Sequence, residues 1–456
     1  MTLPYTYQLK GVRKVHQFKG RALIGDSMGM GKSLQSLLYL HRHQLKPAVI
    51  VCPASLKWNW EHEALIHFGM RTQILEGTKP IKMPLLANKL LIINYDILYA
   101  WLEELRNLNP QLVIIDESGS HIGDRRTRKT KSVQALCKGT PHVLALSGTP
   151  LTNRPVELWP PLNILRPDLF PSFYAFAMRF GGPRRTPFGW DFRGASHVEE
   201  LHQKLTHTCL IRRLKEDVLE ELPEKQRHVV LLDIDRRSEY EHATDDFLDW
   251  LAKTSPAKVA KASKAEKIAK LSYLKQLAAK LKLKAVIEWI DNFLEGTSEK
   301  LIIFAIHKKI IKRLFARYSR ISVVVDGSVR GKQRQLAVRQ FLSNKSTRLF
   351  IGNIKAAGMG WSAKGVSTDA TIEFPWAPGT RIQAGRRTHG LGRGEAGKKS
   401  TSFYLVAKGT LEEKLIKILQ DKQKVLNAVL DGNGKGDQLD IFDQLTQELL
   451  KERKRK

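Results

Sequence analysis

Cysteine is scarce in this sequence: only Cys52, Cys137 and Cys209 occur, and they lie far apart. Their spacing matches neither a disulfide framework nor a metal-binding cluster, and it fits a reducing compartment. No stretch approaches the roughly 18 apolar residues of a membrane span, and the first residues lack the apolar core of a signal peptide. We therefore expect a soluble protein without a membrane partner, cytoplasmic and nucleoid-associated in a bacterial or virus-infected cell and nuclear in a eukaryote.

Acidic residues are few relative to basic ones. The 456 residues include 76 Lys and Arg against 45 Asp and Glu, which gives a formal net charge of +31. Such an excess favours a polyanionic partner, and nucleic acid is the leading candidate. The length is about three times that of a typical domain, so we expect two or three domains.

Short apolar runs alternate with amphipathic stretches that favour helices. This alternation is typical of an α/β fold with buried parallel strands. It occurs before and after a mainly helical interval, and therefore predicts two similar α/β lobes. The predicted strands of the first lobe are 47–52, 89–94, 112–116 and 142–147, and those of the second lobe are 300–305, 321–327, 348–353 and 369–374.

Between the lobes, the stretch from residue 256 to residue 284 is rich in Ala, Lys and Leu and has almost no acidic residue. Its lysines recur every three residues from Lys258 to Lys270, so on an α-helix they spread around the axis. A solubilising helix and a contact to a DNA backbone would both explain this composition. The expected organisation is a first lobe over 1–228, a basic helical insertion over 229–280, a second lobe over 281–408, and a bracing helix with a polar, basic tail over 409–456.

The first candidate site lies in the stretch RALIGDSMGMGKS, where an apolar strand is followed by glycines and then by a helix. Glycines allow backbone N–H groups to close around phosphates, the lysine reaches the outer phosphates, and the serine hydroxyl can ligate magnesium. Asp26 breaks the strict phosphate-loop pattern, and a glycine-rich turn with a chance lysine is the alternative. The expected ATP-binding residues are Gly29, Met30, Gly31, Lys32 and Ser33, with Ser33 also a metal ligand.

Two later strand ends supply groups for hydrolysis. Asp116 and Glu117 directly follow four apolar residues, so they lie at the carboxyl edge of the sheet, where ligands bind in such folds. Asp116 can hold magnesium through its water shell, and Glu117 can orient and deprotonate the attacking water. The next strand ends in a turn of small residues that can sense the nucleotide and couple its state to the lobe: Ser147, Gly148 and Thr149.

Together these stretches resemble the superfamily-two DNA-dependent ATPases of Swi/Snf type. DSMGMGKS, DESG and SGTPLTN match three motifs of that family, and LIRRLKEDVLEELPEKQR (210–227) matches a signature that separates it from other helicases. The resemblance extends from about residue 4 to about residue 430. Within the family, the annealing-helicase or HARP-like subgroup is the most similar, through 154–196, 356–363, 374–392 and 403–426.

The resemblance implies two RecA-like lobes, with parallel sheets flanked by helices and with helical insertions. It implies ATP and Mg²⁺ as cofactors, and double-stranded or forked DNA as the partner, bound through its phosphate backbone. Gln8 matches the upstream glutamine that reads adenine in this superfamily. Eukaryotic members carry further N-terminal modules, and since the phosphate loop begins within the first 30 residues, we expect a minimal motor.

In the second lobe, the resemblance draws attention to QAGRRTHGLGR, 383–393. In the family, a helix with this pattern brings two arginines to the transferring phosphate. Gly390 stands where the second arginine is expected, and on a helix Arg386 lies about 40° around the axis from that position, so it is the candidate substitute. The residues that match or are expected to act here are Gln383, Ala384, Arg386, Arg387, His389 and Gly392, with Gly358 and Gln383 in coupling and Arg386 and Arg387 in catalysis.

Two further departures fall in the same machinery. Ser27 replaces the family Glu, and Gly119 replaces the His that helps to couple hydrolysis to DNA. His121 lies two residues further on and is a candidate to take over that role. These changes weaken the expected coupling to DNA more than they weaken ATP binding.

Contacts to DNA are expected in loops that follow strands of both lobes. Phosphate contacts from such loops explain binding without sequence readout. The alternative is that these are ordinary exposed polar residues. The expected DNA-binding residues are Lys57, Asn94, Tyr95, His307 and Lys308.

The resulting hypothesis is an ATP-dependent double-stranded DNA translocase of helicase type. It would hydrolyse ATP to ADP and phosphate, and remodel or reanneal DNA. A catalytically weak DNA-binding scaffold that uses ATP as a conformational clamp is the second hypothesis, motivated by Gly119 and Gly390. An RNA-directed helicase is a third, which the signature at 210–227 argues against.

Overall fold

The chain divides into two compact units in a computed structural model. The first unit comprises Met1–Arg184, Asp191–Leu222 and Val425–Asp437, and the second Arg185–Trp190, Pro223–Lys424 and Gln438–Lys456. In the part of the chain that the structure describes, no helix is both long enough and apolar enough to cross a bilayer. The described residues are 4–80, 88–151, 153–187, 189–214, 218, 226–253, 262–329, 331–354, 366–376, 401–431, 444–446 and 448–449.

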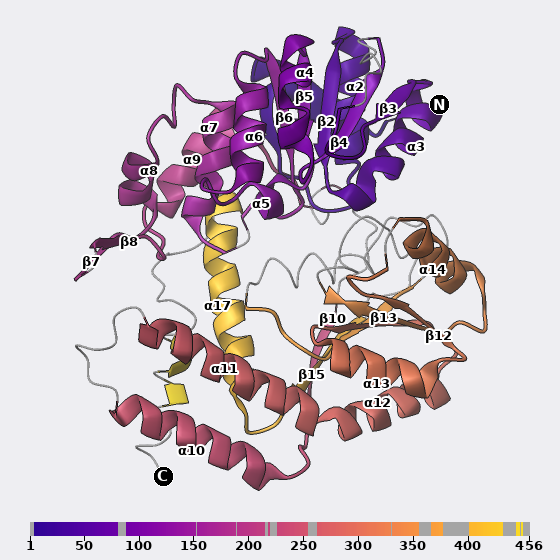
Figure 1. Cartoon of the computed structure of the whole chain (residues 1–456), viewed down its shortest axis with the longest axis vertical. Helices are drawn as coiled ribbons and strands as arrows, with labels where there is room; N and C mark the ends of the chain where they lie inside the picture. Colours follow the sequence, from indigo (N-terminus) through magenta and orange to yellow (C-terminus); the bar gives the residue numbers. More distant parts are fainter. Residues whose placement is uncertain are drawn as a thin grey trace. The chain divides into compact units, whose positions relative to one another are not determined.

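Over the described residues, the first unit is built on a seven-stranded sheet with the order β3-β4-β2-β5-β6-β1-β9 (Figure 1). Every neighbouring pair is parallel. The four strands predicted for this lobe are present as β2, β4, β5 and β6. The bounds are β1 Arg21–Ile24, β2 Ala48–Cys52, β3 Thr72–Ile74, β4 Leu90–Asn94, β5 Leu112–Ile115, β6 His142–Leu146 and β9 Leu210–Ile211.

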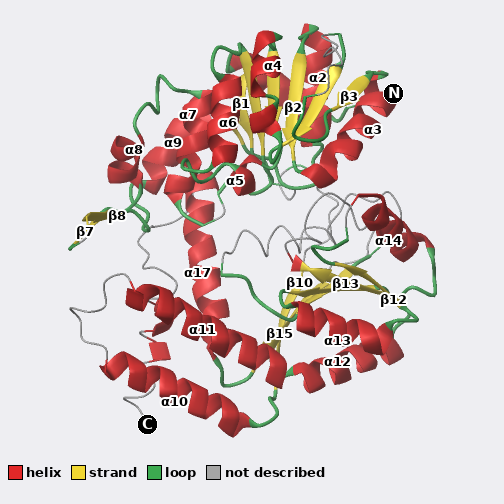
Figure 2. Cartoon of the chain, in the orientation of Figure 1, coloured by secondary structure: helices red, strands yellow, loops and turns green. Residues whose placement is uncertain are grey.

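Helices cover both faces of this sheet (Figure 2), which explains why its strands read as continuous apolar runs. Along β2, Val49 and Val51 join one hydrophobic core, whereas Ile50 and Cys52 join the other. One face is covered by α1 Thr6–Gln17, α2 Lys32–His43 and α3 Lys57–Phe68, and the other by α4 Leu102–Asn107, α6 Arg128–Cys137, α7 Trp159–Leu165 and α9 Val198–Thr208.

Between β6 and β9 the chain forms a helical protrusion. Phe176 and Phe180 of its helix α8 belong to the first hydrophobic core. A short hairpin with exposed side chains follows α8. The elements here are α8 Phe173–Phe180, β7 Arg184–Thr186 and β8 Gly189–Asp191, and the short helix α5 Ser118–His121 follows β5.

The second unit contains a parallel sheet of six strands within the described ranges, in the order β10-β15-β14-β11-β13-β12. The four strands predicted for this lobe are present as β11, β12, β13 and β14. The fold class expected from the sequence, α/β with two lobes of parallel sheet flanked by helices, is confirmed. The bounds are β10 Gln226–Leu232, β11 Leu301–Ala305, β12 Ser322–Val325, β13 Leu349–Asn353, β14 Thr368–Thr371 and β15 Thr401–Ala407.

The expected helical insertion over 229–280 differs from the structure at its start. Strand β10 pairs along its whole length with β15, from Gln226 opposite Thr401 to Leu232 opposite Ala407. Val229 and Leu231 are about half exposed, so this edge strand lacks the continuous buried pattern that identified the other strands.

The helices after β10 belong to the second unit, except that α17 from Val425 onward belongs to the first unit. Phe247 of α10 and Leu274 of α11 pack in one cluster with side chains of α17. Lys282 and Glu412 form a fully buried ion pair in which Lys282 Nζ lies 2.5 Å from Glu412 Oε2. The helices are α10 Arg237–Lys253, α11 Ala262–Leu281, α12 Leu283–Gly296, α13 Lys308–Tyr318, α14 Gly331–Ser343 and α17 Leu411–Asp431.

Candidate active site

The predicted phosphate loop connects β1 to the first turn of α2. Gly29 and Gly31 have φ angles of 81° and 69°, a left-handed conformation in which glycine is favoured. Lys32 is the first residue of α2. Its Nζ donates to the carbonyl oxygens of Asp26 at 3.0 Å and Ser27 at 3.3 Å, so the ammonium lies over the loop itself. The geometry is that of an anion-binding loop at a helix N-terminus.

Gln8 is seated against this loop. Its side chain is buried, and its Nε2 donates to the carbonyl oxygen of Met30 at 3.2 Å. A Cβ added to Gly31 would overlap Gln8 Nε2, so glycine at 31 also permits this close approach. The structure therefore places Gln8 of α1 against Met30 and Gly31 of the loop.

Asp116 and Glu117 follow β5 at the carboxyl edge of the sheet. Asp116 is held by two aromatic side chains: Trp60 Nε1 donates to its Oδ2 at 2.8 Å, and the Tyr95 hydroxyl donates to its carbonyl oxygen at 2.5 Å. Glu117 has a φ of 53°, which is uncommon for a residue with a side chain and is typical of strained functional sites. Both acids are thus fixed by the fold.

The charge of this acidic pair suits a divalent cation. Burial and the adjacent charge of Glu117 raise the pKa of Asp116 to about 7, although Trp60 and Lys32 oppose the rise. A buried carboxylate whose charged form is disfavoured by a neighbouring acid is stabilised when a cation binds. Burial also raises the pKa of Glu63 on α3. Hydrogen bonds from Asn59 and Ser33 partly offset this rise, and Ser33 is the second expected metal ligand. Asp116 and Ser33 carry the oxygen donors that Mg²⁺ prefers.

The turn after β6 packs directly on the phosphate loop. A Cβ added to Gly148 would overlap Met28 Cγ and lie 3.5 Å from Lys32 Nζ. Thr149 N–H donates to Ser147 Oγ at 3.2 Å, which closes the turn. The structure thus brings the expected coupling residues Ser147, Gly148 and Thr149 against the loop that is expected to bind phosphate.

At position 119, where a histidine is expected, the structure leaves no room for a side chain. A Cβ at this position would lie 2.8 Å from the carbonyl oxygen of Pro150 and closer still to that of Thr149. His121 does not replace the missing side chain at that contact. Its ring stacks on Tyr95 at 4.7 Å between centroids, and burial lowers its pKa. The backbone of residue 119 touches the turn directly.

We expect Gly119→Ala to disturb the coupling turn. The added methyl group must displace the backbone at Thr149 and Pro150, which should lower the free energy of unfolding by about 1–3 kcal/mol and reduce ATP hydrolysis. Gly123→Ala is the matched control, because a Cβ there meets only ordinary contacts of 3.4 Å or more. Thermal denaturation and steady-state hydrolysis of both variants would check this. Equal behaviour of the two variants would contradict it.

Three of the expected DNA-binding residues lie inside the first unit. Lys57 is buried and donates to the Leu75 carbonyl at 3.1 Å, and Asn94 and Tyr95 are 7% and 2% exposed. The alternative that these are ordinary exposed polar residues is wrong, because each lies at the start of a helix or at a strand end that packs on the core. Tyr95 supports Asp116. DNA contact by these three residues stays a prediction.

His307 and Lys308 lie at the start of α13 in the second unit. His307 is 30% exposed, and its Nδ1 pairs with Glu373 Oε1, while the N–H groups of Ile306 and His307 donate to Glu373 Oε2 at 2.7 and 2.8 Å. Burial opposes ionisation of Glu373, but these hydrogen bonds outweigh it and lower the pKa. Lys308 is exposed. DNA binding by these two residues stays a prediction.

The second-lobe residues expected in coupling and catalysis lie outside the described residues. These are Gly358, Gln383, Arg386 and Arg387, together with the altered position Gly390.

Two positioning residues were missed by sequence reasoning. Trp60 was not singled out, because nothing in a single sequence distinguishes it from Trp58, which is 44% exposed. Arg213 was part of the family signature, and its side chain pairs with Asp26 of the phosphate loop. Only contacts across the fold identify them.

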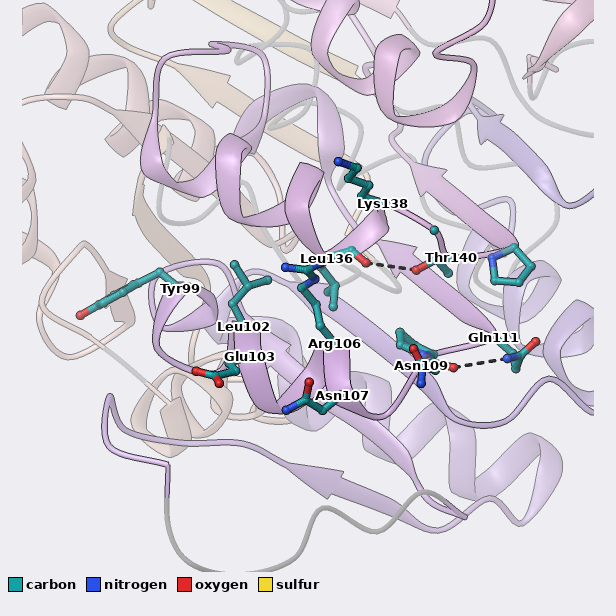
Figure 3. Close-up of a pocket in the computed structure, with 13 residues that line it drawn as sticks. Tyr99, Leu102, Glu103, Arg106, Asn107, Asn109, Gln111, Leu136, Lys138 and Thr140 are labelled. Atoms are coloured by element: carbon teal, nitrogen blue, oxygen red, sulfur yellow. Dashed lines mark hydrogen bonds between the residues drawn. The ribbon is translucent and has the colours of Figure 1, made fainter.

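A polar groove lies at the other edge of the same sheet (Figure 3). It is lined by residues that precede β5 and β6, including Asn109, Gln111 and Thr140, and by Glu103 and Arg106 of α4. The expected site residues follow their strands, whereas these precede them. The groove is therefore separate from the candidate active site.

Two family descriptions match this chain. An SNF2-related domain matches residues 7–288, and a helicase conserved C-terminal domain matches residues 281–392. The first match covers more than half of the 456 residues. The chain belongs to the SNF2-related family. This confirms the resemblance inferred from the motifs and assigns the site above to a family of helicase-type ATPases.

Two relatives and one solved structure illustrate the similarity of this SNF2-related chain. The SWI/SNF-related matrix-associated actin-dependent regulator of chromatin subfamily A-like protein 1 of Xenopus laevis is 31% identical over 92% of this chain and 43% of its own length. The human DNA annealing helicase and endonuclease ZRANB3 is 29% identical over 93% and 40%. This chain thus spans less than half the length of either relative. The Sulfolobus solfataricus SWI2/SNF2 ATPase core in complex with dsDNA is 21% identical, with a TM-score of 0.44, over 98% of this chain and 96% of that chain.

Proposed function

We propose that this chain is an ATP- and Mg²⁺-dependent motor that moves along double-stranded DNA and remodels or reanneals it. The observation that carries the proposal is the meeting of three loops at one edge of the first sheet. The turn at Ser147–Thr149 packs on the phosphate loop, and Asp116 at the end of β5 is near enough to Lys32 of that loop for the lysine charge to oppose the rise of its pKa. A loop for phosphate, an acid beside a cation site and a coupling turn are the parts that ATP hydrolysis requires.

The residues of the first lobe have separable roles in this proposal. Lys32 and the N–H groups of the loop would bind the phosphates, and Gln8 would read the adenine. Mg²⁺, held by Ser33 and Asp116, would supply positive charge at the phosphates. Glu117 would orient the attacking water and accept its proton. Trp60 and Tyr95 keep Asp116 in place through their hydrogen bonds.

The second lobe would complete the site. We propose Arg387, with Arg386 in place of the residue missing at Gly390, as the groups that stabilise charge on the transferring phosphate, and Gly358 and Gln383 in coupling. An arginine in this role accelerates phosphoryl transfer by about 10³ to 10⁵. A chain in which Arg386 fails to substitute would therefore bind ATP but hydrolyse it slowly.

Duplex or forked DNA is the proposed partner. The formal charge of +31 favours a polyanion, and one relative is named a DNA annealing helicase. His307 and Lys308 are the proposed DNA-contacting residues at the start of α13. Contacts of this kind would be made to phosphates and would not depend on the base sequence.

The proposal is tested by steady-state ATP hydrolysis with no nucleic acid, duplex DNA, forked DNA and RNA. We expect duplex or forked DNA to stimulate hydrolysis, and the chain to close an unpaired bubble in duplex DNA when ATP is present. Hydrolysis at the full rate without DNA would contradict coupling. Stimulation by RNA alone would favour an RNA-directed enzyme.

The same assay separates the motor from a scaffold that uses ATP only as a clamp. The absence of a side chain at Gly119 and the glycine at 390 favour the scaffold. Tight ATP binding with negligible turnover, restored in Gly390→Arg, would support the scaffold and contradict the motor. Strong turnover in the natural chain would support substitution by Arg386 or another residue.

A further inference from the structure

The phosphate loop is supported from one side by β9 and the residues that follow it. Gly25 N–H donates to the Ile211 carbonyl at 2.7 Å, and Ser27 N–H donates to the Arg213 carbonyl at 3.0 Å. Arg212 Nη1 adds a hydrogen bond of 2.8 Å to the Gly25 carbonyl. The parallel pairing of β1 and β9 therefore continues beyond the sheet into the first half of the loop.

Arg213 directs its guanidinium into the lobe. Its Nε donates to Asp26 Oδ1 at 3.0 Å, and its Nη2 pairs with Asp26 Oδ2 and donates to Gln35 Oε1 at 2.8 Å. Its Nη1 donates to the Tyr7 carbonyl. The Asp26 side chain is fully buried, and that of Arg213 is 19% exposed. A bidentate arginine–carboxylate pair of this kind fixes geometry as well as charge.

This network ends at the Met30 carbonyl in the middle of the loop. Three side chains donate to that oxygen: the Tyr7 hydroxyl at 3.3 Å, Gln8 Nε2 at 3.2 Å and Gln35 Nε2 at 3.3 Å. Gln35 Nε2 also lies 3.0 Å from Asp26 Oδ2, which links the ion pair to the same carbonyl. A carbonyl oxygen repels phosphate, so the donors from α1 and α2 that bond to this carbonyl reduce its repulsion of an anion at the loop.

Asp26 has an electrostatic effect that must be offset. The backbone carbonyl of Asp26 accepts a hydrogen bond from Lys32 Nζ at 3.0 Å. The buried carboxylate of Asp26 therefore belongs to a residue in direct contact with the phosphate-binding lysine. An unpaired carboxylate here would repel a triphosphate and would itself be costly to bury. Arg213 supplies the opposite charge. The residue that breaks the phosphate-loop pattern in the sequence is therefore part of a neutral pair.

We propose that Arg213 is a positioning residue of the ATP site, which neutralises Asp26 and holds the phosphate loop in its anion-binding conformation. It acts through Asp26, Gln35 and the Met30 carbonyl, and needs no contact with the nucleotide. The inference rests on the proposed function, because it requires ATP to bind at this loop.

The test compares ATP, ADP and adenosine binding to the full chain carrying Arg213→Gln. We expect ATP affinity to fall by about tenfold or more. Without Arg213, the negative charge of Asp26 is no longer neutralised and repels the phosphates in a partly buried site. The loss should be smaller for ADP and smallest for adenosine, because the repulsion from Asp26 grows with phosphate charge. Adding Asp26→Asn to Arg213→Gln should restore most of the ATP affinity. A loss that is equal for the three ligands, or that the second change does not restore, would show that Arg213 supports only the fold.

A matched control is available on the same unit. Arg193 and Asp191 form an ion pair whose side chains are 28% and 20% exposed, in the helical protrusion. Arg193→Gln should leave the three affinities unchanged, and an ATP-selective loss in this variant would overturn the assignment to Arg213. Where Arg213→Gln does not fold, Arg213→Lys keeps the charge but loses the bidentate geometry, so kcat should fall while the preference for ATP over adenosine is kept. Loss of that preference in Arg213→Lys would contradict the proposal.

The failure of this inference can be told apart from the failure of the proposed function. If the natural chain binds ATP no better than Lys32→Ala does, ATP does not bind at this loop and the proposed function fails. If the natural chain binds ATP through Lys32 but Arg213→Gln binds it equally well, only the role of Arg213 is refuted.

Discussion

Lys32→Ala is expected to reduce ATP hydrolysis by about a thousandfold, the scale seen when a main electrostatic contact to a reacting group is removed. The Lys32 ammonium lies over the phosphate loop, bonded to the Asp26 and Ser27 carbonyls. Its loss removes the side-chain positive charge at the loop and leaves those two carbonyls without this donor. ATP affinity should fall as well, whereas DNA binding without nucleotide should be retained. Steady-state hydrolysis and DNA binding measured on one preparation would show both results.

Lys138→Ala is the control for this prediction. Lys138 is an exposed lysine of the same unit and lines the groove that precedes β5 and β6. Its removal changes the net charge by the same amount and should leave hydrolysis unchanged. Full activity in Lys32→Ala would mean that the loop is a glycine-rich turn without a nucleotide.

Glu117→Gln is expected to separate ATP binding from hydrolysis. Glutamine has the same size as glutamate, so the substitution keeps the backbone conformation of residue 117, whose φ is 53°. It removes the carboxylate that would accept a proton. Loss of a general base lowers the rate by about 10² to 10⁴. ATP affinity should be kept or increased, because a negative charge next to the phosphates is removed. Single-turnover hydrolysis together with direct ATP binding would measure the two effects independently.

Glu103→Gln serves as the control for Glu117→Gln, since Glu103 is an exposed acid of α4 that lines the groove. It should behave as the natural chain does. Unchanged turnover in Glu117→Gln would remove Glu117 from catalysis and would leave Asp116 as the candidate acid. Loss of ATP binding in Glu117→Gln would instead indicate a structural role in the strained turn.

Most of the sheets follow from local sequence. Eight apolar runs were predicted as strands, and all eight are present, because a parallel strand covered on both faces must be apolar throughout. Besides β3 and β15, strands β9 and β10 were not predicted. Strand β9 is two residues long, and β10 is an edge strand with Val229 and Leu231 about half exposed. Neither β9 nor β10 carries the continuous apolar run of the eight predicted strands.

The first-lobe site could also be predicted from the sequence, because its chemistry depends on short contiguous stretches of residues. A phosphate loop, an acidic pair and a small turn each follow a strand directly, and parallel strands place their carboxyl ends at one edge. The exposure of the expected DNA-binding residues was harder to predict. Lys57, Asn94 and Tyr95 are polar and follow strands too, yet they point into the first unit. Polarity alone does not tell an exposed loop residue from a buried one that is hydrogen-bonded.

The sequence by itself determined the α/β class, the SNF2-related family and the loops of the candidate active site. These are encoded in contiguous residues, through apolar periodicity and through glycines that permit left-handed backbone. Only the tertiary structure decided what Asp26, Gly119 and Tyr95 do. Asp26 meets Arg213, Gly119 touches the turn at Thr149, and Tyr95 bonds to Asp116, and each of these partners comes from a different segment of the chain. The distances between such segments depend on how the sheet and its helices pack, which no single stretch of sequence specifies.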